Sequence, residues 1–241
     1  MRTQLTLTLA AAACALLIGC SSSNESKKAE EQQAPPAAAP ETPKPAETPA
    51  TAPPEAKKAE SKGLPEKAPD VYKVQMDTSK GLVVMECHKA WSPRGADHFY
   101  DLVKLHFYDD ARFFRVIRGF MAQFGMNGTP MTNSIWANAN IPDDPPAGKH
   151  NTRGMVTYGR TGAPNSRSTQ LFINYADNSR LDPDGFTPVC MVTSGMEVAD
   201  QFWAGYGEAP DQSLIGAQGN AYLNAQFPHL DYIRKATIVL Q

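Results

Sequence analysis

Hydrophobic and polar residues alternate along several short runs of the chain after residue 70, as they do in half-buried β-strands. The first two runs, 71–77 and 82–88, are separated by the turn-forming sequence Thr-Ser-Lys-Gly and predict a β-hairpin. Further strand-like runs lie at 113–117, 120–124, 154–158, 170–175, 187–193 and 232–240. Many short strands with few helices favour a mainly β fold, and we expect a closed, antiparallel, eight-stranded barrel.

Helical patterns are rarer than strand patterns. A helix is predicted over 92–105, because this stretch opens with Ser-Pro and its apolar residues then recur every three or four positions. The stretch 196–203 also has a helical pattern. We interpret 126–153 as a long loop and 205–228 as a surface insertion, with a third candidate helix at 220–226. Two or three helices would therefore cap the barrel.

The composition changes sharply before residue 71. Ten of the 20 prolines lie between residues 21 and 70, together with nine acidic residues, seven lysines and almost no aliphatic or aromatic side chains. Such a segment cannot bury enough apolar surface to offset the entropy of ordering its own backbone. We predict a disordered linker over 20–70 and one folded domain over 71–241.

The first twenty residues predict an export signal. A single basic residue, Arg2, precedes an uncharged apolar stretch that is too short to span a bilayer. The sequence Leu-Ile-Gly-Cys at 17–20 resembles the cleavage motif of bacterial lipoproteins. This resemblance implies a signal peptide at 1–19 and a lipid on Cys20 that anchors the chain to a membrane. Ser21 is typical of sorting to the outer membrane, so we expect a periplasm-facing location in the cell envelope. An ordinary cleavable signal with an incidental cysteine is the alternative.

Charge and motif content exclude several classes of function. The 71–241 domain carries 15 basic and 16 acidic residues, and it lacks the basic surplus with which proteins bind nucleic acid. The five histidines have no ligand spacing and no nucleotide-binding motif occurs, so we expect neither a metal nor a cofactor. Cys87 and Cys190 fit either a disulfide in an oxidising compartment or two ordinary core positions.

One stretch, 113–125, combines an apolar surface with two polar groups. It reads Phe-Phe-Arg-Val-Ile-Arg-Gly-Phe-Met-Ala-Gln-Phe-Gly. Alternation places Arg115 and Ile117 on one side of the first strand, and Met121 and Gln123 on one side of the second. Taken alone, this pattern favours two core strands with a buried arginine over a binding pocket.

The same stretch resembles the signature of the cyclophilin family of peptidyl-prolyl cis-trans isomerases. Further family stretches follow in order, with Arg-Thr at 160–161, Thr-Gln-Leu-Phe-Ile-Asn at 169–174, and Leu181 before Gly185-Phe186. The resemblance covers nearly all of 71–241 apart from the longer segment after residue 205. It implies a cyclophilin-like barrel that accelerates rotation of Xaa-Pro bonds without a nucleophile or cofactor.

Carried over position by position, the resemblance implies that Arg115, Phe120 and Gln123 are catalytic. It also implies a substrate-binding set: Met121, Phe172, Leu181 and Phe186 at the proline pocket, Gln170 beside the arginine, and the backbone of Thr161 and Gly162. The chain departs from common family residues at Phe114, Arg118, Phe124, Arg180 and Phe186. These departures bear on side-chain preference and cyclosporin sensitivity more than on isomerase activity.

The leading hypothesis is a monomeric, membrane-tethered isomerase that acts on proline-containing segments of exported or envelope proteins. The alternative is a non-catalytic chaperone or scaffold that uses the same fold to bind proline-containing peptides. The retained Arg115, Phe120, Met121 and Gln123 favour the enzyme over a structural spacer, since a spacer would have no use for them.

Overall fold

The computed structural model describes residues 67–239. The predicted signal peptide, Cys20 and nearly all of the predicted linker lie outside the described residues and stay predictions. Within 67–239, no helix has both the length and the apolar character needed to cross a bilayer.

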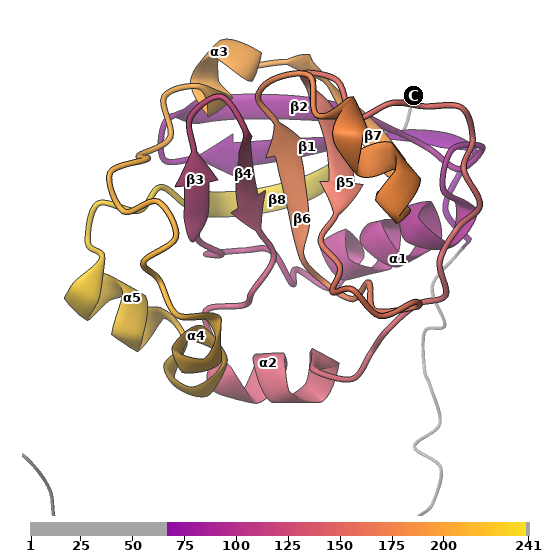
Figure 1. Ribbon diagram of the computed structural model, residues 1–241. Helices are drawn as coiled ribbons and strands as arrows, with labels where there is room; N and C mark the ends of the chain where they lie inside the picture. The colour runs from indigo at the N-terminus through magenta and orange to yellow at the C-terminus, as the bar shows by residue number, and fades with distance from the viewer. Residues whose placement is uncertain (1–66, 240–241) are drawn as a thin grey trace, which may run out of the picture. The chain divides into compact units, whose positions relative to one another are not determined.

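Eight antiparallel strands form one curled sheet in the order β3-β4-β6-β5-β7-β2-β1-β8 (Figure 1). The strands are β1 (Val71–Thr78), β2 (Gly81–His88), β3 (Arg115–Ile117), β4 (Met121–Phe124), β5 (Met155–Tyr158), β6 (Leu171–Asn174), β7 (Pro188–Ser194) and β8 (Ile233–Val239). Each run of alternation in the sequence is confirmed as a strand, with ends that differ by no more than two residues. The mainly β, antiparallel prediction is therefore correct.

The sheet does not close into the barrel expected from the sequence. Its edge strands β3 and β8 are not paired with each other, and the segments that lead into them meet at an isolated bridge between Arg112 and Tyr232. Beside this bridge the N–H of Phe113 donates to the carbonyl of Asp231 at 2.9 Å. Ile233, the first residue of β8, extends this contact, since it accepts from the N–H of Asp110 at 2.7 Å and donates to the carbonyl of Ala111 at 2.9 Å. β3 itself has only three residues, all of which pair with β4. The result is a half-barrel.

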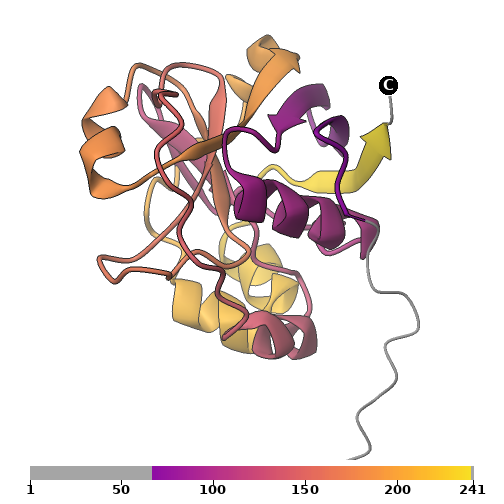
Figure 2. The ribbon, with the colours of Figure 1, turned by 90° about the vertical axis from the view of Figure 1, so that its right-hand side faces the viewer.

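More helices form than the two or three that the sequence predicts. Residues 67–239 contain α1 (Pro93–Lys104), α2 (Pro130–Trp136), α3 (Met196–Ala199), α4 (Gln212–Gln218), α5 (Asn220–Gln226) and the 3-10 helix η1 (Ser179–Asp184). Helix α5 matches the predicted 220–226, whereas α3 ends well before the predicted residue 203. Helix α2 lies inside the predicted loop and beside α4 in both views (Figures 1 and 2). It buries no side chain, so no apolar period marked it in the sequence.

Helix α1 packs against β2, β7 and β8, as its periodicity predicts, through buried Ala96, Phe99 and Val103. Its N-terminus is capped differently from the prediction. Ser92 stands at the expected position but makes no side-chain cap. Instead, Asp144 accepts hydrogen bonds from the N–H of Gly95 at 2.9 Å and from the Ser92 hydroxyl at 2.5 Å. A carboxylate from a distant loop thus caps this helix.

Two hydrophobic clusters hold the described residues together. The larger one fills the space between the sheet and α1, and its residues include Tyr72, Phe99, Phe113, Phe124 and Ile233. The smaller one joins the 205–228 segment to the strand region through Phe114, Ile215, Leu223 and Leu230. Phe114 directly precedes Arg115, so the inserted segment packs against the residue next to the predicted catalytic arginine.

A disulfide connects two strands in the middle of the sheet. Cys87 of β2 lies directly opposite Cys190 of β7, and their sulfur atoms are bonded. Both residues are fully buried. Of the two alternatives that the sequence left open for these cysteines, the structure shows the disulfide.

Candidate active site

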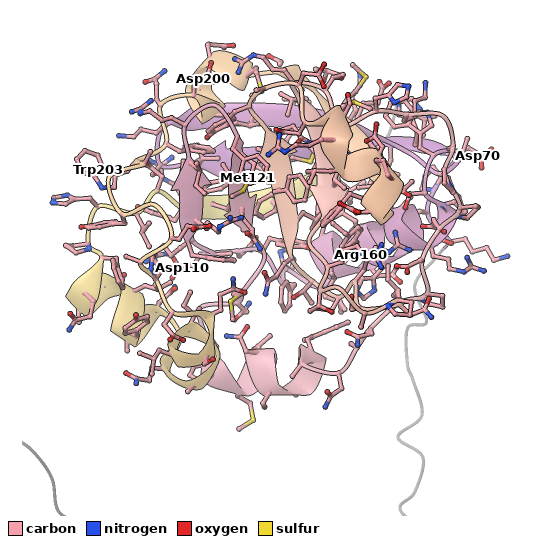
Figure 3. All side chains as sticks on the ribbon, viewed as in Figure 1. Asp70, Asp110, Met121, Arg160, Asp200 and Trp203 are labelled. Atoms are coloured by element: carbon pink, nitrogen blue, oxygen red, sulfur yellow. A yellow bond between two sulfur atoms is a disulfide. The ribbon has the colours of Figure 1, made fainter. Side chains whose placement is uncertain are left out.

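A row of three side chains crosses β3, β4 and β6. Arg115 is the cross-strand partner of Gln123, and Gln123 is the partner of Phe172. Directly opposed residues of antiparallel strands point to the same face of a sheet, so these three side chains share one face. Met121, labelled in Figure 3, is two residues from Gln123 and therefore lies on that face too. The register confirms the alternation expected for these strands.

This face carries an open groove of about 700 Å³. Nine predicted site residues line it: Arg115, Phe120, Met121, Gln123, Thr161, Gln170, Phe172, Leu181 and Phe186. Gly162 is not among the lining residues and is exposed in the adjoining loop. Sequence reasoning missed several residues that also line the groove, among them Ala137, Asn140, Arg160, Ser168 and Gln212.

One end of the groove is apolar. Met121 and Phe172 form its floor and are almost fully buried. The ring of Phe186 meets that of Phe172 edge-on, with centroids 6.0 Å apart, and Leu181 reaches the groove from η1. These four side chains make an apolar pocket of a kind that suits a small apolar ring.

The wall of this pocket is fixed from behind by a polar network centred on the buried Asn151. The Asn151 amide donates to Asp182 Oδ1 and to the carbonyl of Phe186, each at 2.7 Å. His150 Nδ1 lies 2.8 Å from Asp182 Oδ2. Burial would raise the pKa of Asp182, but the hydrogen bonds from Asn151 and His150 outweigh it and lower that pKa below its usual value. Asp182 neighbours Leu181 in η1, so this network holds both pocket residues in place.

Arg115 spans the polar side of the groove. Its Nη1 donates to Gln123 Oε1 at 3.3 Å and lies 3.8 Å from the sulfur of Met121. Its Nε donates to Glu208 Oε1 at 2.7 Å, and its Nη2 pairs with the same oxygen. One edge of the guanidinium therefore faces the groove, and the other is bound to a carboxylate of the inserted segment.

Three glutamine side chains extend the hydrogen bonding of Arg115 along the groove. Gln123 Nε2 donates to Gln170 Oε1 at 2.7 Å, and Gln170 Nε2 donates to Gln212 Oε1 at 3.1 Å. Gln170 thus lies beside the arginine region as the resemblance implied. Glu208 and Gln212 were not found from the sequence, because they belong to the 205–228 segment, where no family motif was recognised. In the sequence, only the unusual length of this segment distinguished it.

The loop after β5 forms the opposite rim of the groove. Within it the N–H of Thr161 donates to Ser166 Oγ at 3.1 Å. The Arg160 guanidinium, labelled in Figure 3, contacts the carbonyl of Asp184 and lies 3.5 Å from a carboxylate oxygen of Asp143. The rim is thereby tied to the end of η1. The backbone roles inferred for Thr161 and Gly162 stay predictions.

The departures from the family occupy different places. The guanidinium carbon of Arg180 lies 4.9 Å from the centre of the Phe120 ring, and that of Arg115 lies 5.7 Å from it. Arg118 is exposed and lines a separate depression with Trp203. Phe124 is part of the large hydrophobic cluster. Arg180 is thus the departure, besides Phe186, that bears on the groove.

Among the described residues, no group of three or more His, Cys, Asp or Glu side chains is arranged to hold a metal ion. The groove itself offers hydrogen-bond donors and acceptors beside an apolar pocket, an arrangement that can hold an extended peptide and position one small apolar residue of it.

The sequence matches a known family and several named relatives. The profile of the family described as "Cyclophilin type peptidyl-prolyl cis-trans isomerase/CLD" matches residues 73–214. A peptidyl-prolyl cis-trans isomerase of Acinetobacter baylyi is 36% identical over 132 residues, covering 53% of this chain and 70% of the relative. Peptidyl-prolyl cis-trans isomerase B of Escherichia coli is 32% identical over 135 residues, covering 53% of this chain and 82% of the relative.

Solved structures share the fold. A cyclophilin-type isomerase of Cryptosporidium parvum superposes with a TM-score of 0.53 at 18% identity, over 71% of this chain and 99% of that one. A cyclophilin of Hirschia baltica superposes with a TM-score of 0.52 at 18% identity, over 71% of this chain and 74% of that one. At these identities the likeness concerns the fold alone.

Proposed function

The chain belongs to the cyclophilin-type peptidyl-prolyl cis-trans isomerases, and from this premise we propose that the groove beside Arg115 binds an Xaa-Pro segment and accelerates rotation about its prolyl bond. The relatives at 36% and 32% identity are named for this activity. The observation that carries the proposal is the cross-strand row of Arg115, Gln123 and Phe172, which sets a cation beside an apolar pocket.

Rotation about a prolyl bond requires no covalent change. Resonance in a peptide bond opposes rotation with a barrier of about 18–20 kcal/mol. A catalyst must hold the proline ring still while the preceding carbonyl swings, and it must stabilise the twisted nitrogen, which regains its lone pair. In our proposal the proline ring is held by the four apolar side chains of the pocket: Met121, Phe172, Leu181 and Phe186. Arg115 donates to the nitrogen, since its guanidinium is always charged and has fixed donor directions.

The magnitudes show that one hydrogen bond is not enough. An acceleration of about 10⁵-fold corresponds to roughly 7 kcal/mol of barrier. A hydrogen bond from a charged group contributes about 1.5–3 kcal/mol. The apolar pocket must therefore supply much of the remainder by holding the ring away from water.

Measuring isomerase rate and peptide affinity on the same samples tests this function. Arg115→Ala in the full chain should lower the turnover of an Xaa-Pro peptide about 10- to 100-fold and weaken binding only slightly. Wild-type rates in this variant would contradict the mechanism. Wild-type protein that binds the peptide without accelerating its isomerisation would instead support the non-catalytic binder.

We further propose that residues 20–70 tether this enzyme to a membrane of the cell envelope through a lipid on Cys20, where it acts on exported proteins. The support is the sequence of the first seventy residues. A linker of about fifty residues spans roughly 40 Å as a flexible coil and roughly 150 Å as an extended polyproline helix. Cys20→Ser should release the protein into the soluble fraction, and retention in the membrane fraction would refute the anchor.

A further inference from the structure

The inserted segment 205–228 touches both ends of the polar side of the groove. A series of hydrogen bonds connects these ends, running outward from Arg115. Arg115 donates to Glu208 at 2.7 Å and to Gln123 at 3.3 Å. Gln123 donates to Gln170 at 2.7 Å, and Gln170 donates to Gln212 at 3.1 Å. The series begins at Glu208 and ends at Gln212, four residues later, so a single segment binds both of its ends.

The segment is itself firmly attached next to β3. The backbone N–H of Asn220 donates to the carbonyl of Gly128 at 2.8 Å, and the side-chain amide of Asn220 donates to Asp110 Oδ2 at 2.8 Å. Arg112, three residues before Arg115, donates to Asn224 Oδ1 at 3.0 Å. The apolar side is held by the small cluster of Phe114, Ile215, Leu223 and Leu230. Glu208 and Gln212 are therefore carried by a segment whose position relative to β3 is fixed.

The position of Glu208 on the guanidinium decides what it can do. Its carboxylate binds the Nε and Nη2 edge, whereas Nη1 points to Gln123 and Met121. Glu208 does not line the groove, and its side chain is 63% exposed. It thus holds the arginine from the side away from the groove and does not occupy Nη1, which faces the groove and donates to Gln123.

We propose that Glu208 and Gln212 are positioning residues of the active site. Glu208 fixes the rotation of the Arg115 side chain so that Nη1 is directed at the bound prolyl bond, and Gln212 fixes the amide of Gln170 and, through it, that of Gln123. A planar guanidinium is useful for catalysis only when its donors are held in the productive direction. The inference rests on the proposed function, because Glu208 acts through Arg115.

The test compares kcat and KM of full-length Glu208→Ala, Glu208→Gln and Gln212→Ala for one Xaa-Pro peptide. Because the Glu208 side chain is largely exposed, Glu208→Ala should lower kcat about two- to fivefold and leave KM within about twofold. Glu208→Gln keeps an acceptor for Nε and should recover part of the loss. Gln212→Ala should produce a smaller decrease of kcat. Glu197→Ala and Gln218→Ala, which replace exposed residues away from the groove, serve as matched controls and should keep wild-type kcat.

The dependence of kcat on ionic strength distinguishes the positioning role of Glu208 from a purely structural one. Salt screens exposed ion pairs, so the kcat of the wild type should approach that of Glu208→Ala between about 0.05 and 1 M salt, while the kcat of Glu208→Ala stays constant. Arg115→Ala with Glu208→Ala should show the kcat of Arg115→Ala alone, because Glu208 acts through that side chain.

Several results would overturn the inference. These are an unchanged kcat in Glu208→Ala, a higher kcat, which would mean that the carboxylate competes with the substrate, or a change confined to KM. Should Glu208→Ala unfold, the salt series of the wild type and Glu208→Gln still decides the matter. Arg115→Ala separates the two proposals: wild-type activity in that variant contradicts the proposed function, whereas loss of activity there with wild-type kcat in Glu208→Ala contradicts only the positioning role.

Discussion

The carboxylate of Asp144 lies 3.1 Å from Nη2 of Arg167, and both side chains are almost fully buried. The same carboxylate accepts hydrogen bonds from the first turn of α1. Burial would raise the pKa of Asp144, but hydrogen bonds from Ser92, Gly95 and Arg94, together with the charge of Arg167, lower it from its usual value. One ion pair therefore joins α1 to the loop that forms a rim of the groove.

Removing this buried carboxylate should destabilise the fold strongly. Asp144→Ala leaves the buried Arg167 with only the more distant carboxylate of Asp143, 3.5 Å from its Nε, and the free energy of unfolding should fall by about 3 kcal/mol in urea denaturation at pH 7. Asp200→Ala, which breaks the exposed pair of Arg153 and Asp200, is the matched control and should cost less than about 1 kcal/mol. Equal losses in the two variants would contradict this account. Since the folded-state pKa of Asp144 is lowered, its contribution is present above about pH 4 and is lost as the pH falls through that pKa.

Asp101 should have the opposite dependence on pH. Burial on α1, followed by the charge of Asp97 one turn earlier, raises the pKa of Asp101 to about 6. The folded state then binds more protons than the unfolded state between about pH 4 and 6, so this group lowers stability as the pH rises through that window. Asp101→Asn should raise the melting temperature at pH 7 and have little effect near pH 4. A stabilisation of the same size at both pH values would refute the raised pKa.

The disulfide between Cys87 and Cys190 should contribute to stability through the unfolded state. It closes a loop with a sequence separation of 103 residues. Replacing both cysteines with alanine should lower the free energy of unfolding by about 2–4 kcal/mol in urea denaturation. A reductant should shift the wild type toward the double variant and leave the variant unchanged. If the unfolding curve of the wild type does not respond to a reductant that reaches the unfolded chain, the prediction fails.

Phe120 should affect both binding and turnover. Its ring lines the groove between the guanidinium groups of Arg115 and Arg180. Phe120→Ala removes an apolar wall worth about 1.5–3 kcal/mol, so kcat/KM should fall about 10- to 100-fold, with changes in both constants. Trp203→Ala removes an exposed aromatic ring outside the groove and should leave kcat/KM unchanged. A wild-type kcat/KM in Phe120→Ala would place the substrate elsewhere.

The sequence predicts the strands and most of the groove well for a physical reason. β1 and β2 alternate between buried and more exposed residues, and β4, β5 and β6 are short runs buried on both faces, so both kinds of pattern are visible locally. The row of Arg115, Gln123 and Phe172 follows from alternation and family motifs. The closed barrel was wrong because the meeting of β3 and β8 depends on the length of β3 and on pairing between residues such as Arg112 and Tyr232, which are far apart in the chain. Local patterns hold no information about such closure.

The elements that the sequence missed owe their position to distant contacts. Helix α2 buries no residue and α4 buries only Ile215, so neither shows an apolar period. The carboxylate that caps α1 comes from Asp144, 52 residues after Ser92. Glu208 lies 93 residues from Arg115, inside a segment whose sequence shows no recognisable family motif. Only the folded chain brings these groups together.

The order of strands in the sheet also affects which strand pairs can form first as the chain is synthesised. β1 lies between β2 and β8, and its partner residues Thr78 and Ile233 are 155 residues apart in the chain. Ribosomes add about 5–20 residues per second, so β8 is synthesised roughly 8–30 s after β1. During this time one edge of β1 has no partner strand. Cys190 of β7 is translated within that interval, so every strand from β1 to β7 precedes the one that covers the second edge of β1. Until residues 233–239 emerge, β1 therefore presents an unpaired edge with which the edge of another chain can pair.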